Sequence, residues 1–353
     1  MKLMENLANR FSDKLGLCAI KLARKETDVQ VTINRLRAVE RHLPSMPIQK
    51  ELLRLSHLAF SERQSFSNTH AGDRLPSSAS NRKTAVSQEL RATPIANLTA
   101  ERIAQEIGSQ GCVLVKGFLS AKESKKLRDT IDRALADKQE YDRLHIGTRW
   151  YDPFTDIQDR EQRKELNKQR IAMGKYPTST FIADSPTAFA MWLNVIRQTG
   201  LGDVIAQYIG RRPALSLSKT VLRRQPPMQH CGGWHQDGAF LGAHVKTLNA
   251  WIALTDCGEA APGLDVLPRR IELMPTGTVG AHFSWSISDD LVRQTYPGEI
   301  IRPKFKAGDL LLFDHFLLHR TASAPDMTED RYAIESWFFS PDAFPDRYAG
   351  FLI

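Results

Sequence analysis

The sequence predicts a mainly β fold with flanking helices, in which a sandwich or barrel follows a helical N-terminal extension. Two observations predict this fold class. From residue 213 onward, short apolar runs alternate with Gly and Pro, which is typical of short strands joined by turns. Residues 1–60 instead carry apolar side chains at helical spacing, as at Ile33, Leu36 and Val39.

Composition divides the chain into three regions. Residues 1–60 are expected to form a basic helical extension, and residues 96–353 the globular domain. Residues 61–95 between them are rich in Ser, Asn, Arg and Gly. Because such a polar segment can bury little apolar surface, we expect a linker or long loop there.

Within the globular region, helices are expected over 99–110, 120–135 and 185–210. The second of these helices starts with Ser120 and Glu123 at the spacing of a capping box. Residues 138–180 are polar and aromatic without a clear period. The predicted strands are CVLVKGF (112–118), ALSLSKTVL (214–222), TLNAWIALTD (247–256), DLLLFDHFLLH (309–319) and YAIESWFFS (332–340).

The positive charge is concentrated in the N-terminal part of the chain. Residues 1–100 carry 16 Lys and Arg against 9 Asp and Glu, a net of +7, whereas the remaining residues carry 32 against 31. A basic helical arm of this kind can bind RNA, membrane lipid or an acidic partner, although a solvated helix face gives the same pattern. No motif for nucleic-acid recognition accompanies it, so no specific nucleic acid is expected.

The lack of a recognisable targeting signal and the spacing of the cysteines predict a cytoplasmic protein. No apolar run reaches the roughly 18 residues of a membrane span, and the N-terminus has no apolar stretch followed by a signal-peptide cleavage site. The cysteines are scattered without a CxxC pair, which indicates reduced thiols rather than a zinc ribbon or a disulfide framework. They are Cys18, Cys112, Cys231 and Cys257.

The stretch GGWHQDGAFLG (232–242) places His235 and Asp237 two residues apart. In an extended chain these two side chains point to the same side and can bind one metal ion, although a hydrogen-bonded pair at a turn is the simpler reading. A later predicted strand ends in His315 and His319, four residues apart and facing the same way. Two histidines and one carboxylate form the facial triad of non-haem Fe(II) oxygenases, which leaves coordination positions open.

A cationic side chain follows the pair His315 and His319. Two open metal positions suit the keto-acid end of 2-oxoglutarate, and its far carboxylate then needs a planar, bidentate cation. Arg331, at the start of the next predicted strand, is the candidate. The alternative for Arg331 is a surface ion pair with one of its acidic neighbours, Asp326, Glu329 or Asp330.

Alternation along 215–223 places Leu215, Leu217 and Lys219 on one strand face. If the leucines face the barrel interior, Lys219 points inward with them and needs an anionic partner. That partner can be a structural carboxylate, 2-oxoglutarate or an acidic substrate. Gln236 faces away from its two neighbours and is expected to brace the loop.

The order HQD, APGLDVLP, GDLLLFDHFLLHRT and a downstream Arg resembles the phytanoyl-CoA dioxygenase family, and so does the earlier GCVLVKGFLSAKESKKLRDTIDRA. The resemblance covers about residues 98–345. It implies a double-stranded β-helix (jelly-roll) core, Fe(II), 2-oxoglutarate as cosubstrate and O2. It also implies metal ligation by His235, Asp237 and His319 and a cosubstrate anchor at Arg331, with Arg320 as the fallback. Trp251 lines the cosubstrate pocket by resemblance, or belongs to the core.

The function expected from this resemblance is an Fe(II)- and 2-oxoglutarate-dependent dioxygenase that hydroxylates a C–H bond of a small molecule and releases succinate and CO2. In the related iron halogenases a small residue replaces the carboxylate ligand, so the intact Asp237 favours hydroxylation. Residues 138–180 and 269–300 are expected to cover the pocket. Phe283, Trp285 and Arg270 in the second segment indicate either a substrate with apolar and anionic parts or a role in packing alone.

Two other classes of function share the same residues. A jelly-roll protein can hold a metal or ligand without turnover, as a binding or sensor protein. A hydrolase can use a zinc-activated water at the same triad, but it needs neither a buried arginine nor dioxygen.

Overall fold

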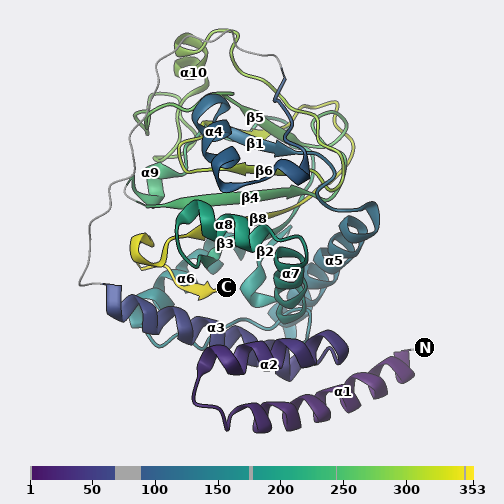
Figure 1. Cartoon of the computed structure of the whole chain (residues 1–353). Helices are drawn as coiled ribbons and strands as arrows, with labels where there is room; N and C mark the ends of the chain where they lie inside the picture. The colour runs from purple at the N-terminus through teal and green to yellow at the C-terminus, as the bar shows by residue number, and fades with distance from the viewer. Residues whose placement is uncertain (1, 68–88, 175–177, 244, 346) are drawn as a thin grey trace.

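A computed structural model describes residues 2–67, 89–174, 178–243, 245–345 and 347–353 (Figure 1). Helices dominate the N-terminal half, and strands the C-terminal half. The helices are α1 (Lys2–Ala23), α2 (Val29–His42), α3 (Met46–Ser67), α4 (Ala100–Gln110), α5 (Ala121–Leu144), α6 (Arg160–Gly174), α7 (Pro186–Gln198), α8 (Leu201–Ile209), α9 (Gly238–Leu241) and α10 (Asp289–Thr295).

The strands form two antiparallel layers. A seven-stranded sheet has the order β1-β6-β4-β8-β3-β2, with β9 also paired to β3, and β5 pairs with β7 in the second layer. Isolated bridges extend the second layer on both sides of β5 and β7. The strands are β1 (Cys112–Val115), β2 (Ser179–Phe181), β3 (Ala214–Gln225), β4 (Thr247–Ala253), β5 (Gly263–Val266), β6 (Leu310–Phe313), β7 (His319–Ala322), β8 (Arg331–Phe339) and β9 (Gly350–Leu352).

Local sequence accounts for where the helices begin and end. Ser120 caps α5 through the amide of Glu123, whose side chain binds back to the Ser120 amide, so the predicted capping box is present. Thr99 caps α4, and Gly111 ends it in a left-handed conformation with φ of 79°. Residues 138–180 contain the end of α5 and all of α6, although no period predicted a helix. Leu166 alone is buried on α6, so this helix has no apolar stripe to detect.

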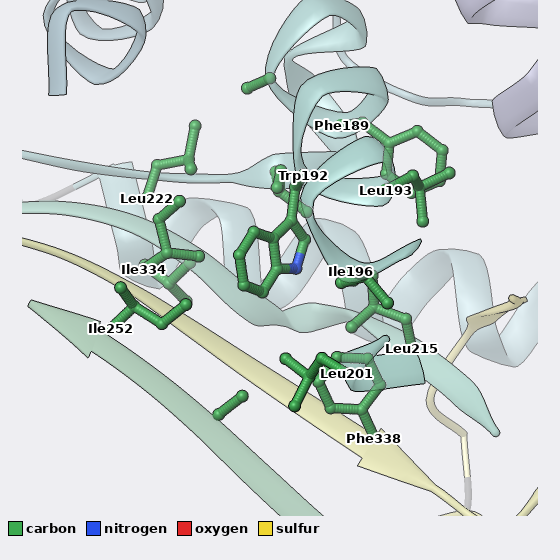
Figure 2. Packing of buried hydrophobic residues seen from close by; sticks show 14 of the residues in the cluster. Phe189, Trp192, Leu193, Ile196, Leu201, Leu215, Leu222, Ile252, Ile334 and Phe338 are labelled. Atoms are coloured by element: carbon green, nitrogen blue, oxygen red, sulfur yellow. The ribbon is translucent and has the colours of Figure 1, made fainter. Parts of the chain in front are cut away.

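Strands β1, β4, β6 and β8 of the large sheet contribute alternate residues to two cores. On one face, Trp192 of α7 packs against Leu222, Ile252 and Ile334 from three neighbouring strands (Figure 2). The other face lies against the second layer, where Trp251 and Phe313 pack with Val266 of β5. This inner space between the two β layers is the interior of the jelly roll.

An irregularity in β3 reverses its alternation and corrects one expectation. Leu215 pairs with Phe338 and Thr220 with Ser336, so five residue steps on β3 lie opposite two on β8. Because the difference is odd, the side chains after the bulge change faces. Leu215 and Leu217 therefore pack in the helix-covered core, while Lys219 lies on the inner side. Lys219 faces inward as predicted, but the prediction that it shares a strand face with Leu215 and Leu217 is wrong.

The N-terminal helices pack on the body of the protein. They lie beyond α7 as seen from the large sheet, and α3 contacts both α7 and β9 (Figure 1). Phe60 is fully buried, and its ring lies 4.7 Å from that of Phe344. The boundary expected at residue 60 falls inside α3, because the helix continues to Ser67. Residues 68–88 of the expected linker lie outside the described residues, and the domain division stays a prediction.

All four cysteines are free thiols, as their spacing indicated. Cys112 and Cys257 are buried, and burial raises the pKa of Cys257 to about 12, so that thiol is neutral. The cytoplasmic location inferred from the cysteines stays a prediction.

Among the described helices, none is both long enough and apolar enough to cross a bilayer.

Candidate active site

Two backbone hydrogen bonds place His235 directly opposite His319. The amide of each residue donates to the carbonyl of the other at 3.0 Å, so the two residues form a hydrogen-bonded pair of an antiparallel ladder. Residues paired in this way project from the same face. Both imidazoles therefore lie on one side of the second layer, with ring centroids 4.3 Å apart, although 84 positions separate them in the chain.

Asp237 lies where the extended segment turns into α9, with helical φ and ψ of −63° and −21°. Its Oδ2 lies 3.7 Å from Nε2 of His319. Ligand atoms from His235, Asp237 and His319 all fall within 4.8 Å of one another. Burial raises the pKa of Asp237 above its ordinary value even though His319 and Lys219 are near. A carboxylate in this environment is stabilised by a bound cation.

The two imidazoles are oriented for a cation by the backbone. Nδ1 of His235 lies 2.9 Å from the carbonyl of Gly233, and Nδ1 of His319 lies 3.0 Å from the carbonyl of Leu317. A carbonyl only accepts, so each Nδ1 carries the hydrogen and each Nε2 keeps its lone pair. Burial and the neighbouring His319 hold the pKa of His235 well below its ordinary value, so this ring is neutral. The donor set fits a divalent transition metal that accepts imidazole and carboxylate ligands.

Gln236 braces the segment between His235 and Asp237, as expected from its position. Its Nε2 donates to the carbonyls of Glu272 and Phe316 at 3.1 and 2.7 Å, and its Oε1 accepts from the amide of Met274 at 2.8 Å. The side chain is 1% exposed, so these bonds form without competition from water. They attach the segment 235–237 to two other segments of the chain, around residues 272–274 and 316.

Arg331 lies inside the jelly roll, and the alternative of a surface ion pair is wrong for it. Its side chain is 1% exposed, and Nη1 donates to the carbonyl of Gly263 at 3.0 Å. Its Nε has no hydrogen-bond partner within the described residues. Burial lowers the pKa of Arg331 to about 10, which still leaves it cationic at neutral pH. Asp330, one of the acidic neighbours, pairs with Arg224 instead.

The fallback residue, Arg320, is already committed to two carboxylates. It lies 2.9 Å from Asp265 and 2.8 Å from Asp289, and its guanidinium stacks 4.4 Å from the Trp234 ring centroid. A cosubstrate carboxylate would have to displace these partners. His315, the rival of His319, is buried against Phe316 and is not one of the three residues that converge.

Lys219 faces the three converging residues from the large sheet. Burial lowers its pKa, and the carboxylates that act most strongly against this shift are those of Asp237 and Glu335. Its Nζ lies 4.0 Å from the Phe240 ring centroid, and Lys219 forms no salt bridge within the part of the chain that the structure describes. A cation without a salt-bridge partner at this place favours binding of an anion.

Sequence reasoning missed two charged residues beside Arg331. Glu335 lies on the same face of β8, and its Oε2 is 3.2 Å from Nη2 of Arg223 on β3. Burial acts to raise the pKa of Glu335, but Arg223 and Arg331 outweigh it and hold that pKa below its ordinary value. The alternation of β8 from Arg331 carried the signal, because every second residue of that strand faces inward.

Trp251 belongs to the inner core, which is one of the two roles expected for it; the other was to line the cosubstrate pocket. It is 1% exposed, its ring centroid lies 4.9 Å from that of Phe305, and it lies opposite Glu335 in the ladder. Its Nε1 has no hydrogen-bond partner within the described residues. A buried indole N–H of this kind is available to a ligand oxygen.

Aromatic rings flank the exposed side of the site. The ring of Trp285 approaches His235 edge-on at 5.2 Å, and Phe283 stacks on Trp285 at 4.7 Å. The ring of Phe240 lies 5.8 Å from Trp285 on another side. Arg270 does not join them: it pairs with Asp314 and lies 4.4 Å from the Phe316 ring centroid. The expected contact between Arg270 and an anionic substrate is therefore opposed by an existing ion pair.

A protein-family model described as phytanoyl-CoA dioxygenase (PhyH) matches residues 107–330, more than half of the chain. The chain belongs to the phytanoyl-CoA dioxygenase family. As a member of it, the protein has the double-stranded β-helix fold and is an iron- and 2-oxoglutarate-dependent oxygenase that acts on a small molecule with O2. The converging donors and the buried Arg331 fit these cofactors. An acidic partner for the N-terminal helices finds no support in this assignment.

Solved structures with similar folds accompany the family match. EctD from S. alaskensis, crystallised with 2-oxoglutarate and 5-hydroxyectoine, is 18% identical over 76% of this chain and 87% of that chain, with a TM-score of 0.47. AviO1 from Streptomyces viridochromogenes Tue57 is 15% identical over 72% and 99%, with a TM-score of 0.44. EvdO2 from Micromonospora carbonacea var. aurantiaca, complexed with 2-oxoglutarate, is 16% identical over 68% and 90%, with a TM-score of 0.43. No curated protein sequence matches the chain.

Proposed function

We propose that the enzyme hydroxylates a C–H bond of a small molecule, with Fe(II) held by His235, Asp237 and His319. The observation that carries this proposal is the orientation of the three side chains. Both histidines have Nδ1 tied to a backbone carbonyl, so their Nε2 lone pairs and the Asp237 carboxylate face one point. The intact carboxylate supports hydroxylation, because the related halogenases lack it.

Arg331, Lys219 and Trp251 are proposed to bind 2-oxoglutarate. The guanidinium of Arg331 would pair with its far carboxylate, since a planar fork matches a carboxylate and Nε has no other partner. Lys219 adds a second cation on the same inner face, and the unpartnered Nε1–H of Trp251 adds a donor. Glu335 would hold the arginine pair in place and repel the cosubstrate from its own side of the pocket.

When bound, iron supplies the coupled oxidation of 2-oxoglutarate to succinate and CO2 and of the substrate by dioxygen. The chain contributes position and a dry environment. Phe240, Phe283 and Trp285 offer apolar surface next to the half-buried His235, which favours a substrate with an apolar or aromatic part. Segments 138–180 and 269–300 remain the proposed covers of this pocket.

The proposal is tested by anaerobic titration of the purified protein with Fe(II) and 2-oxoglutarate, followed by addition of dioxygen. We expect a visible charge-transfer band, and then succinate. The Asp237→Ala protein should lose both signals. His230→Ala is the matched control, because His230 is exposed and lies outside the converging triad, and it should keep both.

Three results discriminate between the proposal and its rivals. Succinate at the wild-type level from Asp237→Ala would contradict the ligand assignment. Metal binding without a band or succinate would favour a binding or sensor protein. Isotopically labelled dioxygen distinguishes hydroxylation, which places one labelled oxygen in the product, from an oxidation that places none there.

A further inference from the structure

Four arginines gather where the N-terminal helices meet the body of the protein. Arg37 and Arg41 lie one turn apart on α2, Arg197 lies in the last turn of α7, and Arg212 follows α8. The charges of these arginines interact. Burial and the positive charges of Arg197, Arg212 and Arg41 together lower the pKa of Arg37 to about 9. In Figure 1, α2 lies below α7, on the opposite side of β4 from β5 and α10.

Hydrogen bonds from α7 and from the segment after α8 hold these elements to α2. Asn194 of α7 donates from Nδ2 to Glu40 of α2 at 3.4 Å, three residues before Arg197 in the chain. Arg212 donates to the side chain of Gln30 at the start of α2 and, through Nε, to the carbonyl of Ile353 at 2.6 Å. Arg197 and Arg212 therefore lie on two segments that are both bonded to α2.

Arg37 is buried without a counterion. It is 8% exposed, and its Nε and Nη2 have no hydrogen-bond partner within the described residues. In the same part of the chain, Arg37, Arg41 and Arg197 form no salt bridge. Every charge that acts appreciably on Arg37 is positive. Buried cations are normally paired, so this arrangement is unfavourable unless an anion joins it.

Glu40, the acid of α2, compensates this charge only in part, because it acts on Arg197 but not appreciably on Arg37. Glu40 is 6% exposed, and its two oxygens accept from the amides of Gln49 and Asn194 at 3.0 and 3.4 Å. One carboxylate also leaves the charge of four guanidinium groups largely uncompensated. The four arginines differ in solvent exposure. Arg41 is exposed, Arg197 and Arg212 are half-buried, and Arg37 is buried. The cluster is thus open to a ligand from solvent.

We propose that Arg37, Arg41, Arg197 and Arg212 bind a phosphate group, at a site separate from the metal centre. Guanidinium forks pair with phosphate oxygens in a bidentate manner, and a dianion with several acceptor oxygens can serve several forks at once, which a single carboxylate cannot. A cavity of about 690 Å³ meets the cluster at Arg212. Gln30 and Arg63 also line it, and so do the acidic residues Asp28, Glu62 and Asp342, so the phosphate itself is placed at the arginines and not in the cavity. The cavity offers room for the rest of a phosphate ester.

The test is isothermal titration of the full-length protein at low ionic strength with two probes, inorganic phosphate and ribose 5-phosphate. We expect binding to wild type, and Arg37→Gln should weaken it by roughly 10- to 100-fold, the loss expected for one charged hydrogen-bonding group. Arg35→Gln is the matched control on the same helix. Arg35 is largely exposed and pairs with Glu26 at 3.2 Å, so its variant should bind as wild type does.

The two probes identify the source of the phosphate group. Tighter binding of ribose 5-phosphate indicates an ester, and equal binding indicates free phosphate. Without ligand, Arg37→Gln should melt at a higher temperature than wild type, because it removes a buried charge among like charges. Asp237→Ala should bind both probes normally, so this test does not depend on the proposed oxygenase chemistry. No binding of either probe to wild type, or equal losses in Arg35→Gln and Arg37→Gln, would overturn the proposal.

Discussion

Nη1 of Arg331 donates to the carbonyl oxygen of Gly263 at 3.0 Å and thereby links β8 of the large sheet to β5 of the opposite layer. The bond fixes a guanidinium in the interior of the jelly roll, 5.7 Å from the Trp251 ring centroid. It uses one N–H group, and Nε has no partner within the described residues. An arginine held in this way has donors left for a carboxylate.

Arg331→Lys should raise the KM for 2-oxoglutarate by about 10- to 100-fold, because lysine keeps the charge but loses the planar fork. Binding of Fe(II) alone should be unchanged, since Arg331 is not a proposed ligand. Steady-state succinate formation and a metal titration measure the two effects.

Arg320→Gln is the control for that variant. It should leave the KM unchanged and lower the melting temperature, because Asp265 and Asp289 lose a partner. A larger KM effect from Arg320→Gln than from Arg331→Lys would reverse the assignment of the anchor.

Gln236→Ala should lower the free energy of unfolding by about 2–4 kcal/mol, because three buried backbone groups lose their partner. It should also weaken Fe(II) binding, since His235 and Asp237 flank it. Urea unfolding and a metal titration measure these effects. Gln198→Ala, at an exposed position on α7, should change neither.

His57 should make the protein less stable in acid. It is 2% exposed, its Nδ1 lies 3.0 Å from the carbonyl of Gly350, and burial lowers its pKa. The unfolded chain then binds the proton more readily, with a pKa of about 6.5, so the contribution of His57 is complete above that pH and decreases as pH falls below it. We expect a loss of up to about 1 kcal/mol between pH 7.5 and 5.5.

His57→Asn isolates this effect, because an amide can donate to the same carbonyl but does not titrate. Urea unfolding across this pH range should show a shallower pH dependence for the variant than for wild type. Parallel curves for the two proteins would exclude His57 as the cause.

Phe60→Ala should destabilise the whole protein by about 3–5 kcal/mol, the cost of a large cavity in a packed core. Phe60 of α3 packs on Phe344 near the C-terminal strand, so its loss should affect the jelly roll and not only the N-terminal helices. Phe11→Ala is the control, because Phe11 is 66% exposed and its loss should change stability by less than about 0.5 kcal/mol. Calorimetry with a single transition for both proteins would support one cooperative unit.

Much of the site could be predicted because its signals are local. His235 and Asp237 are two positions apart in the chain. The apolar, strand-forming residues around His319 and Arg331 indicate inward-facing positions. The capping box of Ser120 and Glu123 is a contact within one helical turn, which sequence reports well. The family resemblance supplied what local patterns left open, namely the choice of His319 over His315.

Other features depend on contacts between distant segments. The face of the sheet on which Lys219 lies follows from a register shift between β3 and β8. Alternation along β3 alone would place Lys219 on the same face as Leu215 and Leu217, which is wrong. The pairing of Arg223 with Glu335 joins two strands that are 112 positions apart. Composition placed positive charge in the N-terminal region but could not show that the charge of Arg37 is buried within electrostatic range of Arg197 and Arg212 of the body.

The sequence by itself determined the fold class and the candidates for the metal site and the cationic anchor, because these depend on side-chain chemistry and on periods of two and 3.6 residues; the choice of His319 came from the family resemblance. The tertiary structure decided which arginine is free and which is paired, which face each strand residue occupies after a bulge, and where like charges are buried together. Those outcomes depend on packing between elements, since burial and pairing set the free energy of a charge and neither is encoded within a single segment.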